Sequence, residues 1–145
     1  MQKVLQMYTS HFRSSALKVT AALIVVRSRL FIGQRPAAKK FGLQWEFPGG
    51  KVQSGEKLED SLAREIEEEL CWHIRVDGLF RHLQHNYPDF TIDLFAYWCT
   101  IEKGSLCLKE HVAYSWVSLE ELNNFDFTAA DKQLVRYLQE LNKLP

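Results

Sequence analysis

A chain of 145 residues, 46% hydrophobic and 25% charged, has the length and composition of a single soluble domain with a proper core. Its formal net charge is zero, so no overall field attracts it to nucleic acid or to acidic membranes. The longest apolar run, residues 20–26, is far too short to span a bilayer. We therefore expect no membrane association and no stable complex with nucleic acid.

Three cysteines, Cys71, Cys99 and Cys107, are odd in number and form no C-x-x-C pair. This pattern argues against a disulfide framework and against a structural zinc site. A secretory signal is not expected either, because Lys18 interrupts the approach to the apolar run and no small-residue cleavage pattern follows. The predicted location is a reducing cytoplasm.

The chain is interpreted as an N-terminal extension over residues 1–17, which show no clean period, and a single domain over residues 18–145. Interspersed strands and helices predict an α/β fold in which a mixed β-sheet lies between helices. Periodicity and turn residues predict, in chain order, strands over 18–26, 30–35 and 44–47, a helix over 57–71, strands over 76–85, 90–99 and 114–117, a short helix over 119–122 and an amphipathic helix over 131–141.

The most unusual stretch runs from a glycine turn at residues 49–50 into the helix predicted over residues 57–71. Glu65, Glu68 and Glu69 stand at positions i, i+3 and i+4, so they project from one helical face. Like charges at this spacing destabilise a helix by roughly 0.2–0.5 kcal/mol per pair. Clustered carboxylates are the ligands that Mg²⁺, and also Mn²⁺, prefers, so the pattern indicates a divalent metal site.

A run of charges on a helix can also be a solvated surface, and Glu67, which points away from this face, is interpreted in that way. Arg64 is a permanent cation with a fixed fork of donors, and Glu56 precedes it by eight residues, where the two can pair. A metal beside an arginine favours a phosphoryl or pyrophosphoryl substrate, because positioning and charge neutralisation supply most of the catalysis in such reactions.

The spacing of Gly50, Glu56 and the run over residues 64–69 resembles the Nudix box, the signature of the Nudix hydrolases. The segment over residues 45–52, Trp-Glu-Phe-Pro-Gly-Gly-Lys-Val, is similar to the MutT-like branch, which includes 8-oxo-dGTP diphosphatases and CTP pyrophosphohydrolases. The resemblance implies a Nudix-type α/β/α sandwich. It also implies Mg²⁺-dependent hydrolysis of a nucleoside triphosphate, oxidised, modified or cytosine-containing, to a monophosphate and pyrophosphate.

The resemblance also implies roles for the charged residues of the box. Arg64 and Glu56 are expected to form the ion pair that orders it, and Glu68 is favoured as the general base. Four groups are expected to bind the metal: the carboxylates of Glu65, Glu68 and Glu69 and the main-chain carbonyl of Gly49.

Further site residues are expected outside the box. Glu110 lies before the strand predicted over residues 114–117, where MutT-like enzymes carry a glutamate that approaches the metal or the attacking water; the alternative is an exposed loop acid. Arg35 matches a substrate-contacting arginine. The lysines at 39–40 could steer a triphosphate, although loop lysines are commonly only solvated.

The base pocket is expected to involve Phe47, Tyr87 and Asp131. The aromatic ring of Tyr87 could stack on the nucleobase, with Phe47 as a second wall. Asp131 falls where MutT reads 8-oxoguanine with an asparagine. An ionised aspartate only accepts hydrogen bonds, which suits an exocyclic amine such as cytosine N4, whereas a protonated one could still donate. The alternative role of Asp131 is a helix N-cap.

The chain departs from the family pattern after Leu70, because Cys71 and Trp72 stand where the Nudix box ordinarily continues with glycine and an aliphatic residue. Glycine at a helix end often adopts the left-handed conformation, which costs any other residue roughly 1 kcal/mol.

Two other functions stay open: hydrolysis of the 5′ end of RNA, and a Nudix-fold nucleotide-binding module that has lost catalysis. The expected partner is a nucleoside triphosphate, and the protein is expected to be a monomer or a homodimer.

Overall fold

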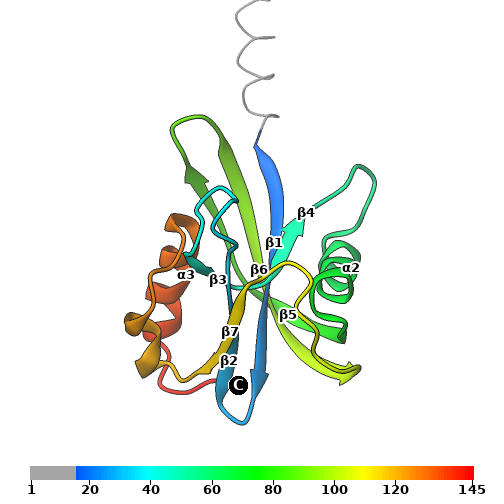
Figure 1. Ribbon diagram of the computed structural model, residues 1–145, viewed down its shortest axis with the longest axis vertical. Coiled ribbons are helices and arrows are strands. Elements are labelled where there is room, and N and C mark those ends of the chain that lie inside the picture. Colours follow the sequence, from blue (N-terminus) through cyan, green and yellow to red (C-terminus); the bar gives the residue numbers. More distant parts are fainter. Residues whose placement is uncertain (1–15) are drawn as a thin grey trace, which may run out of the picture.

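The computed structural model describes residues 16–145, so nearly all of the predicted N-terminal extension lies outside the described residues, and its boundary stays a prediction. Figure 1 shows a twisted sheet between two helices. In chain order the elements are β1 (Leu17–Val26), β2 (Arg29–Gln34), β3 (Trp45–Glu46), β4 (Gly49–Lys51), α2 (Leu58–Leu70), β5 (His73–Asn86), β6 (Thr91–Lys103), β7 (Ala113–Val117), η1 (Glu120–Asn124, a 3₁₀ helix) and α3 (Ala129–Gln139).

Strand β1 is the centre of the sheet. It runs parallel to β6 and antiparallel to β2 and β4, so the sheet is mixed, as predicted. The strand order is β3-β2-β1-β6-β5, with β4 paired to β1 and β7 paired to β2. The first half of β1 pairs with β4 and its last two residues pair with β2. The glycine turn is therefore held against the middle of the sheet.

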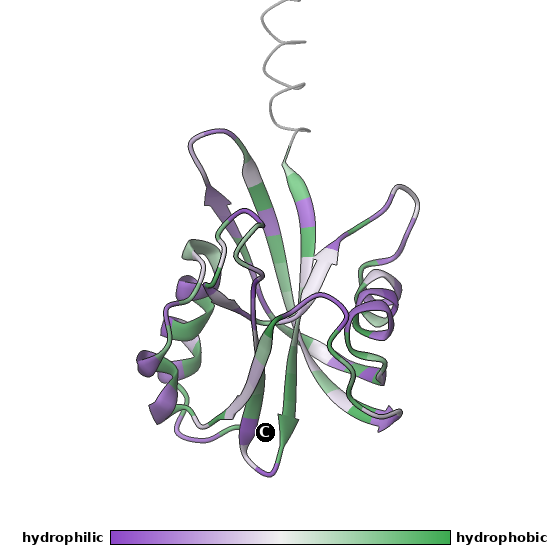
Figure 2. Ribbon diagram, viewed as in Figure 1, coloured by the Kyte–Doolittle hydropathy of each residue, from purple (hydrophilic) through white to green (hydrophobic). Residues whose placement is uncertain are grey.

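Both faces of β1 are buried, one under each helix. Ala21 and Leu23 belong to the core beneath α3, whereas Ala22 and Ile24 belong to the core beneath α2. This follows from the alternation of side chains along a strand, and it explains why β1 reads as a nearly continuous apolar run. Both helices turn apolar faces inward and polar faces outward (Figure 2). The predicted α/β/α sandwich is confirmed.

The structure refines several predicted elements. The hairpin of β5 and β6 is longer than expected, and the glycine turn itself forms β4. Helix α3 begins two residues earlier than predicted, with Thr128 as its N-cap. The interpretation of Asp131 as an N-cap is therefore wrong, because Asp131 lies inside the first turn. Among residues 16–145 no helix is long and apolar enough to cross a membrane.

The expectation that no disulfide forms is also wrong. Cys71 and Cys107 are joined in a disulfide with a Cα–Cα distance of 5.7 Å, and Cys99 is free and buried. An odd count leaves one cysteine over but does not prevent the other two from meeting. The N–H of Cys107 donates to the carbonyl of Leu70 at 3.1 Å, which brings the two sulfurs together. The prediction of a reducing compartment loses the support it drew from unpaired cysteines.

The end of α2 explains this departure from the family pattern. Cys71 has φ 63° and ψ 20°, the left-handed conformation that glycine adopts at no steric cost. The helix therefore ends in the same backbone conformation that a glycine would adopt, and Cys71 carries the steric strain of that conformation. In exchange, the side chain of Cys71 forms a covalent link to a segment 36 residues away.

Replacing Cys71 by glycine should have opposite effects on stability in reducing and oxidising buffer. With a reductant, C71G should raise the free energy of unfolding by about 1 kcal/mol, because the left-handed strain disappears. Without a reductant, C71G also removes the cross-link, which closes a long loop and stabilises the fold by about 3–4 kcal/mol. The free energy of unfolding should then fall by about 2–3 kcal/mol, because this loss exceeds the relieved strain of about 1 kcal/mol. Urea unfolding measures both, and C99S is the matched control. If dithiothreitol leaves the wild-type midpoint unchanged, the disulfide does not form in solution.

Candidate active site

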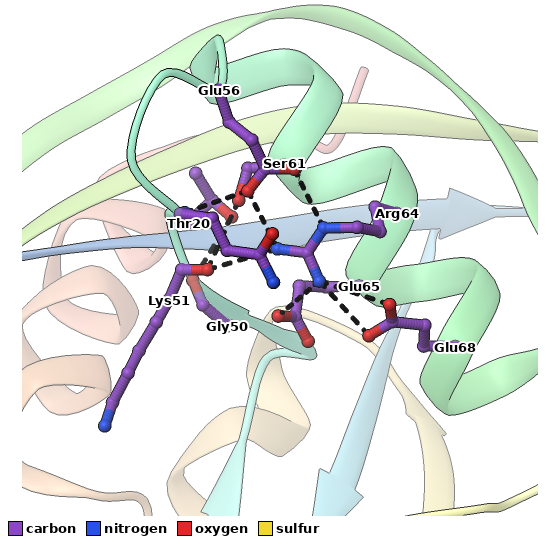
Figure 3. Close-up of polar contacts among 9 residues, drawn as sticks. Thr20, Gly50, Lys51, Glu56, Ser61, Arg64, Glu65 and Glu68 are labelled. Carbon is purple, nitrogen blue, oxygen red and sulfur yellow. Dashed lines mark hydrogen bonds and ion pairs between the residues drawn. The ribbon is translucent and has the colours of Figure 1, made fainter.

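Arg64 is the centre of the charged cluster on α2 (Figure 3). Its Nε and Nη2 donate to the two carboxylate oxygens of Glu56 at 2.8 and 2.9 Å, which confirms the expected pairing. This two-point contact holds the pKa of Glu56 at about 2. Nη1 of the same guanidinium reaches Glu65 at 3.1 Å and Glu68 at 3.2 Å. One cation therefore holds three carboxylates, and it offsets the like-charge repulsion along the helix.

The glycine turn leaves the space that the side chain of Glu65 occupies. A Cβ atom at Gly50 would overlap the carboxylate of Glu65, so only glycine lets that side chain lie against β4. Nη2 of Arg64 also donates to the carbonyl of Lys51 at 3.3 Å, which ties the helix to the same strand. Glu68, by contrast, is 58% exposed, and Glu67 is exposed, as predicted. The carboxylates thus form a graded series from buried to solvated.

Glu69 is partly buried, and one of its carboxylate oxygens is enclosed. Its Oε2 atom is inaccessible and has no hydrogen-bond partner among residues 16–145. Burial, followed by the neighbouring charges of Glu46 and Glu65, raises the pKa of Glu69 to about 9. An uncompensated buried carboxylate is costly, and a cation is the group that would relieve the cost.

The donor set around Glu69 fits a hard divalent cation. It consists of carboxylate oxygens with a glycine-rich backbone beside them, which are the ligands typical of Mg²⁺. Within the described part of the chain, no three such side chains are already gathered as they would be around an ion. The reason is visible in Figure 3, where Glu65 and Glu68 are turned toward Arg64. The metal-ligand assignment stays a prediction.

Beside this cluster lies a cavity of about 590 Å³ that joins most of the predicted site residues. This volume is typical of small-molecule sites. Its wall carries both carboxylates and cations, with apolar side chains between them. The predicted residues that line it are Arg35, Phe47, Gly49, Glu69, Tyr87, Glu110 and Asp131. The cavity is not lined by the other predicted residues, Glu56, Arg64, Glu65 and Glu68. This cluster adjoins the cavity through Gly50, which contacts Glu65, and Lys51, which contacts Arg64, because both of these residues line it.

One end of the cavity is aromatic. The ring of Tyr87 is stacked between those of Phe41 and Phe90, with centroid distances of 4.9 and 4.8 Å. Its hydroxyl accepts a hydrogen bond from the N–H of Ala130, at the start of α3, at 3.2 Å. Because both faces of the Tyr87 ring are covered in this way, the predicted stacking of the nucleobase on Tyr87 has no free face, and a planar base could be received only at the edge or outer faces of this aromatic stack. Phe47, the other predicted wall, is buried and stacks on Phe127.

Asp131 lies at the same end, and only 6% of its surface is exposed. Its Oδ2 accepts a hydrogen bond from the N–H of Phe47 at 2.8 Å. Burial, and then the charge of Glu46, raise the pKa of Asp131 to about 8. The carboxyl group is therefore mostly protonated at neutral pH, so it can donate a hydrogen bond as well as accept one.

The loop over residues 36–44 crosses the rim of the cavity between two anionic groups. Lys39 pairs with Glu110 at 2.6 Å, and Lys40 pairs with Asp89 at 2.8 Å. The Lys39 ammonium holds the pKa of Glu110 below its ordinary value. Both loop lysines thus line the cavity and are not merely solvated. Glu110 lines the cavity too, which favours a role in the site over that of an exposed loop acid.

Sequence reasoning missed Glu46, an ionic residue of this wall, and His111 behind it. Glu46 lines the cavity and pairs with Arg35 at 2.8 Å. His111 lies behind it, with a fully buried side chain. The available signals were a charge between two aromatic residues in a short strand, and a histidine directly after the predicted Glu110. Neither signal distinguishes a buried partner from a surface residue without the fold.

Comparison with known proteins places this geometry in a family. The NUDIX domain profile matches residues 20–137. An 8-oxo-dGTP diphosphatase from Buchnera aphidicola is 32% identical over 124 residues, covering 85% of this chain and 93% of that protein. A CTP pyrophosphohydrolase from Escherichia coli is 32% identical over 125 residues, covering 86% and 93%. The solution structure of the E. coli ORF135 protein superposes with a TM-score of 0.76 at 31% identity, covering 88% and 91%.

Magnesium should stabilise the folded protein through Glu69. We expect Mg²⁺ at a hundredfold excess over its Kd to raise the free energy of unfolding by about 3 kcal/mol. E69Q should abolish this gain, and without metal it should be more stable than wild type above neutral pH, because it removes a buried charge. Thermal unfolding with MgCl₂ or EDTA measures both effects, with E67Q as the control. An equal Mg²⁺ effect in E69Q would remove Glu69 from the site.

Proposed function

Because the chain belongs to the Nudix hydrolase family, in its MutT-like branch, we propose that it hydrolyses a nucleoside triphosphate to the monophosphate and pyrophosphate. The observation that carries the proposal is the single cavity that connects Glu69 with the aromatic end at Tyr87. A nucleoside triphosphate has the matching polarity, with a planar base at one end and a chain of anionic phosphates at the other.

The phosphate end combines both signs of charge that such a substrate requires. Arg35, Lys39 and Lys40 line the cavity and can receive phosphate oxygens. Glu65, Glu68, Glu69 and the carbonyl of Gly49 would hold Mg²⁺ or Mn²⁺. When bound, such an ion polarises phosphoryl oxygens and makes a water molecule more acidic.

The chain's own residues supply the remaining steps. Arg64 holds Glu56, Glu65 and Glu68 on one side of the helix and offsets their mutual repulsion in the absence of an ion. Glu68 is the carboxylate we assign as general base, because it is the most accessible of the three on this face and can exchange a proton with solvent. Glu110, which lines the same cavity as Glu69, supports the attacking water.

A binding module without catalysis has weaker support. Such a protein could replace Glu69 with an apolar or amide side chain and gain stability, because the Oε2 atom of the carboxylate is buried without a partner among residues 16–145. Retention of the acid, together with intact Glu65, Glu68 and Arg64, is explained by metal-dependent hydrolysis.

The nucleobase is read, in this proposal, by Asp131. Its Oδ2 is committed to the N–H of Phe47, which leaves the other oxygen for a base edge in the cavity. In the protonated state that carboxyl group can donate to a carbonyl such as that of an oxidised purine. In the ionised state it only accepts, which favours an exocyclic amine such as cytosine N4. Oxidised purine and cytosine nucleotides are therefore both candidate substrates.

Hydrolysis is tested by incubating the protein and Mg²⁺ with a panel of canonical, oxidised and methylated nucleoside triphosphates. At least one should yield monophosphate and pyrophosphate, and E68Q should lower turnover at least about a hundredfold, because the general base is lost. E67Q, on the solvated face, should retain activity, and thermal unfolding confirms that both variants fold. If no substrate is cleaved above the E68Q background, the proposed function is wrong.

Base selection is tested with D131N at two pH values. At about pH 6.5, below the raised pKa of Asp131, both side chains can donate, so the ratio of kcat/KM for cytosine over 8-oxoguanine triphosphate should be similar in the two proteins. At about pH 9 the wild-type ratio should rise, because ionised Asp131 only accepts, whereas that of D131N should stay. A ratio insensitive to both pH and substitution would exclude Asp131 from base reading.

The same titration has a stability counterpart that serves as a control. The folded-state pKa of Asp131 lies above its ordinary value of 3.8, so its ionisation destabilises the fold and stability falls as pH rises between the two values. D131N cannot ionise. Its unfolding free energy relative to wild type should therefore grow with pH, by at most about 1.4 kcal/mol per pH unit.

A further inference from the structure

His111 is the only buried histidine among residues 16–145, and its side chain is fully inaccessible. It follows Glu110 directly and precedes β7, whose start is fixed by a hydrogen bond from the N–H of Val112 to the carbonyl of Gln34. Its ring lies against Gly33 of β2 so closely that a Cβ atom at Gly33 would overlap it. The site on β2 is therefore shaped to admit this ring.

The ring has one polar partner, and that partner faces the cavity. His111 Nε2 lies 2.9 Å from Oε2 of Glu46. A carboxylate can only accept, so Nε2 donates. The other oxygen of Glu46 accepts from Nη1 of Arg35 at 2.8 Å, and Nε of Arg35 donates to the carbonyl of Lys40 at 2.8 Å. A continuous chain of hydrogen bonds thus runs from the buried ring to the loop at the cavity rim.

Glu46 occupies a position that matters to both ends of the cavity. Its charge is the neighbouring charge that most raises the pKa of Glu69 at the phosphate end and of Asp131 at the base end. Both oxygens of Glu46 are occupied by Arg35 and His111, so its orientation is determined from two sides. A partly buried ion pair of this kind contributes little to stability compared with apolar packing, which favours a role in orientation.

We propose, resting on the proposed function, that His111 is a positioning residue: through Glu46 it fixes the guanidinium of Arg35 at the cavity wall for the triphosphate. The ring itself does not touch substrate, because no part of it is accessible. Its effect reaches the substrate through Arg35, so its loss should be felt mainly as weaker binding of the triphosphate and only secondarily as slower turnover.

Two amide substitutions of different reach separate positioning from packing. In H111Q the amide nitrogen can take the place of Nε2 and donate to Glu46, whereas in H111N the shorter amide reaches only the place of Nδ1. Using the substrate identified by hydrolysis, we expect H111N and H111A to lower kcat/KM about 10- to 100-fold, mostly through KM, and H111Q to recover most of the loss. V112A, an exposed neighbour, is the matched control.

A double-mutant cycle with R35A completes the test. If His111 acts through Arg35, H111N should add little to the effect of R35A on KM, whereas independent roles would multiply. Thermal unfolding of each variant accounts for any that fails to fold, and H111Q and H111N remain comparable if H111A does not. Equal activity of H111Q and H111N, or multiplicative effects with R35A in an active wild type, would overturn the positioning role. An inactive wild type would instead overturn the proposed function.

Discussion

The two-point contact between Arg64 and Glu56 is the interaction on which the candidate active site depends. Without a cation at this point, the carboxylates that follow on α2 would repel one another and turn to solvent. The guanidinium suits the task because its fork of donors can bind Glu56 with two nitrogens and still reach Glu65 and Glu68 with the third. A lysine offers a point charge without this geometry. The contact also joins the loop before the helix to the helix itself, so one side chain fixes the backbone of the turn and the directions of the carboxylates.

From this cluster inward, the carboxyl groups on α2 and α3 change from exposed to buried. Glu68 is solvated, Glu65 lies against Gly50 of β4, and Glu69 is partly buried with a pKa raised to about 9. Asp131, farther along the wall, has a pKa raised to about 8 for the same principal reason, burial. Identical chemical groups therefore perform different work according to their distance from water. The exposed carboxylates beside Arg64 can neutralise a cation, whereas the buried carboxyl group of Asp131 can donate or accept a hydrogen bond.

Much of this arrangement could be predicted from the sequence because its determinants are local. The repeat of Leu62, Ile66 and Leu70 determines which face of α2 is buried, and the i, i+3, i+4 spacing then determines where the glutamates point. Contacts between distant segments could not be predicted in the same way. Neither the disulfide between Cys71 and Cys107 nor the pairing of Glu46 with His111 leaves a periodic trace, since each depends on how loops fold back. Asp131 is not the cap because the helix begins two residues before it, after the N-cap Thr128.

The two unpredicted contacts act on one segment, and together they explain how a loop can carry a site residue. The chain between β6 and β7 is attached to α2 at Cys107 by the disulfide and at Lys109 by a backbone hydrogen bond to Glu69. Two residues farther on, the buried ring of His111 attaches it to β2 and Glu46. Glu110 lies between these anchors, with its backbone held on both sides and its side chain left facing the cavity. Glycine at position 71 would end the helix with less strain but would leave the first attachment to hydrogen bonds alone. The strained cysteine is therefore best understood as part of the support for Glu110.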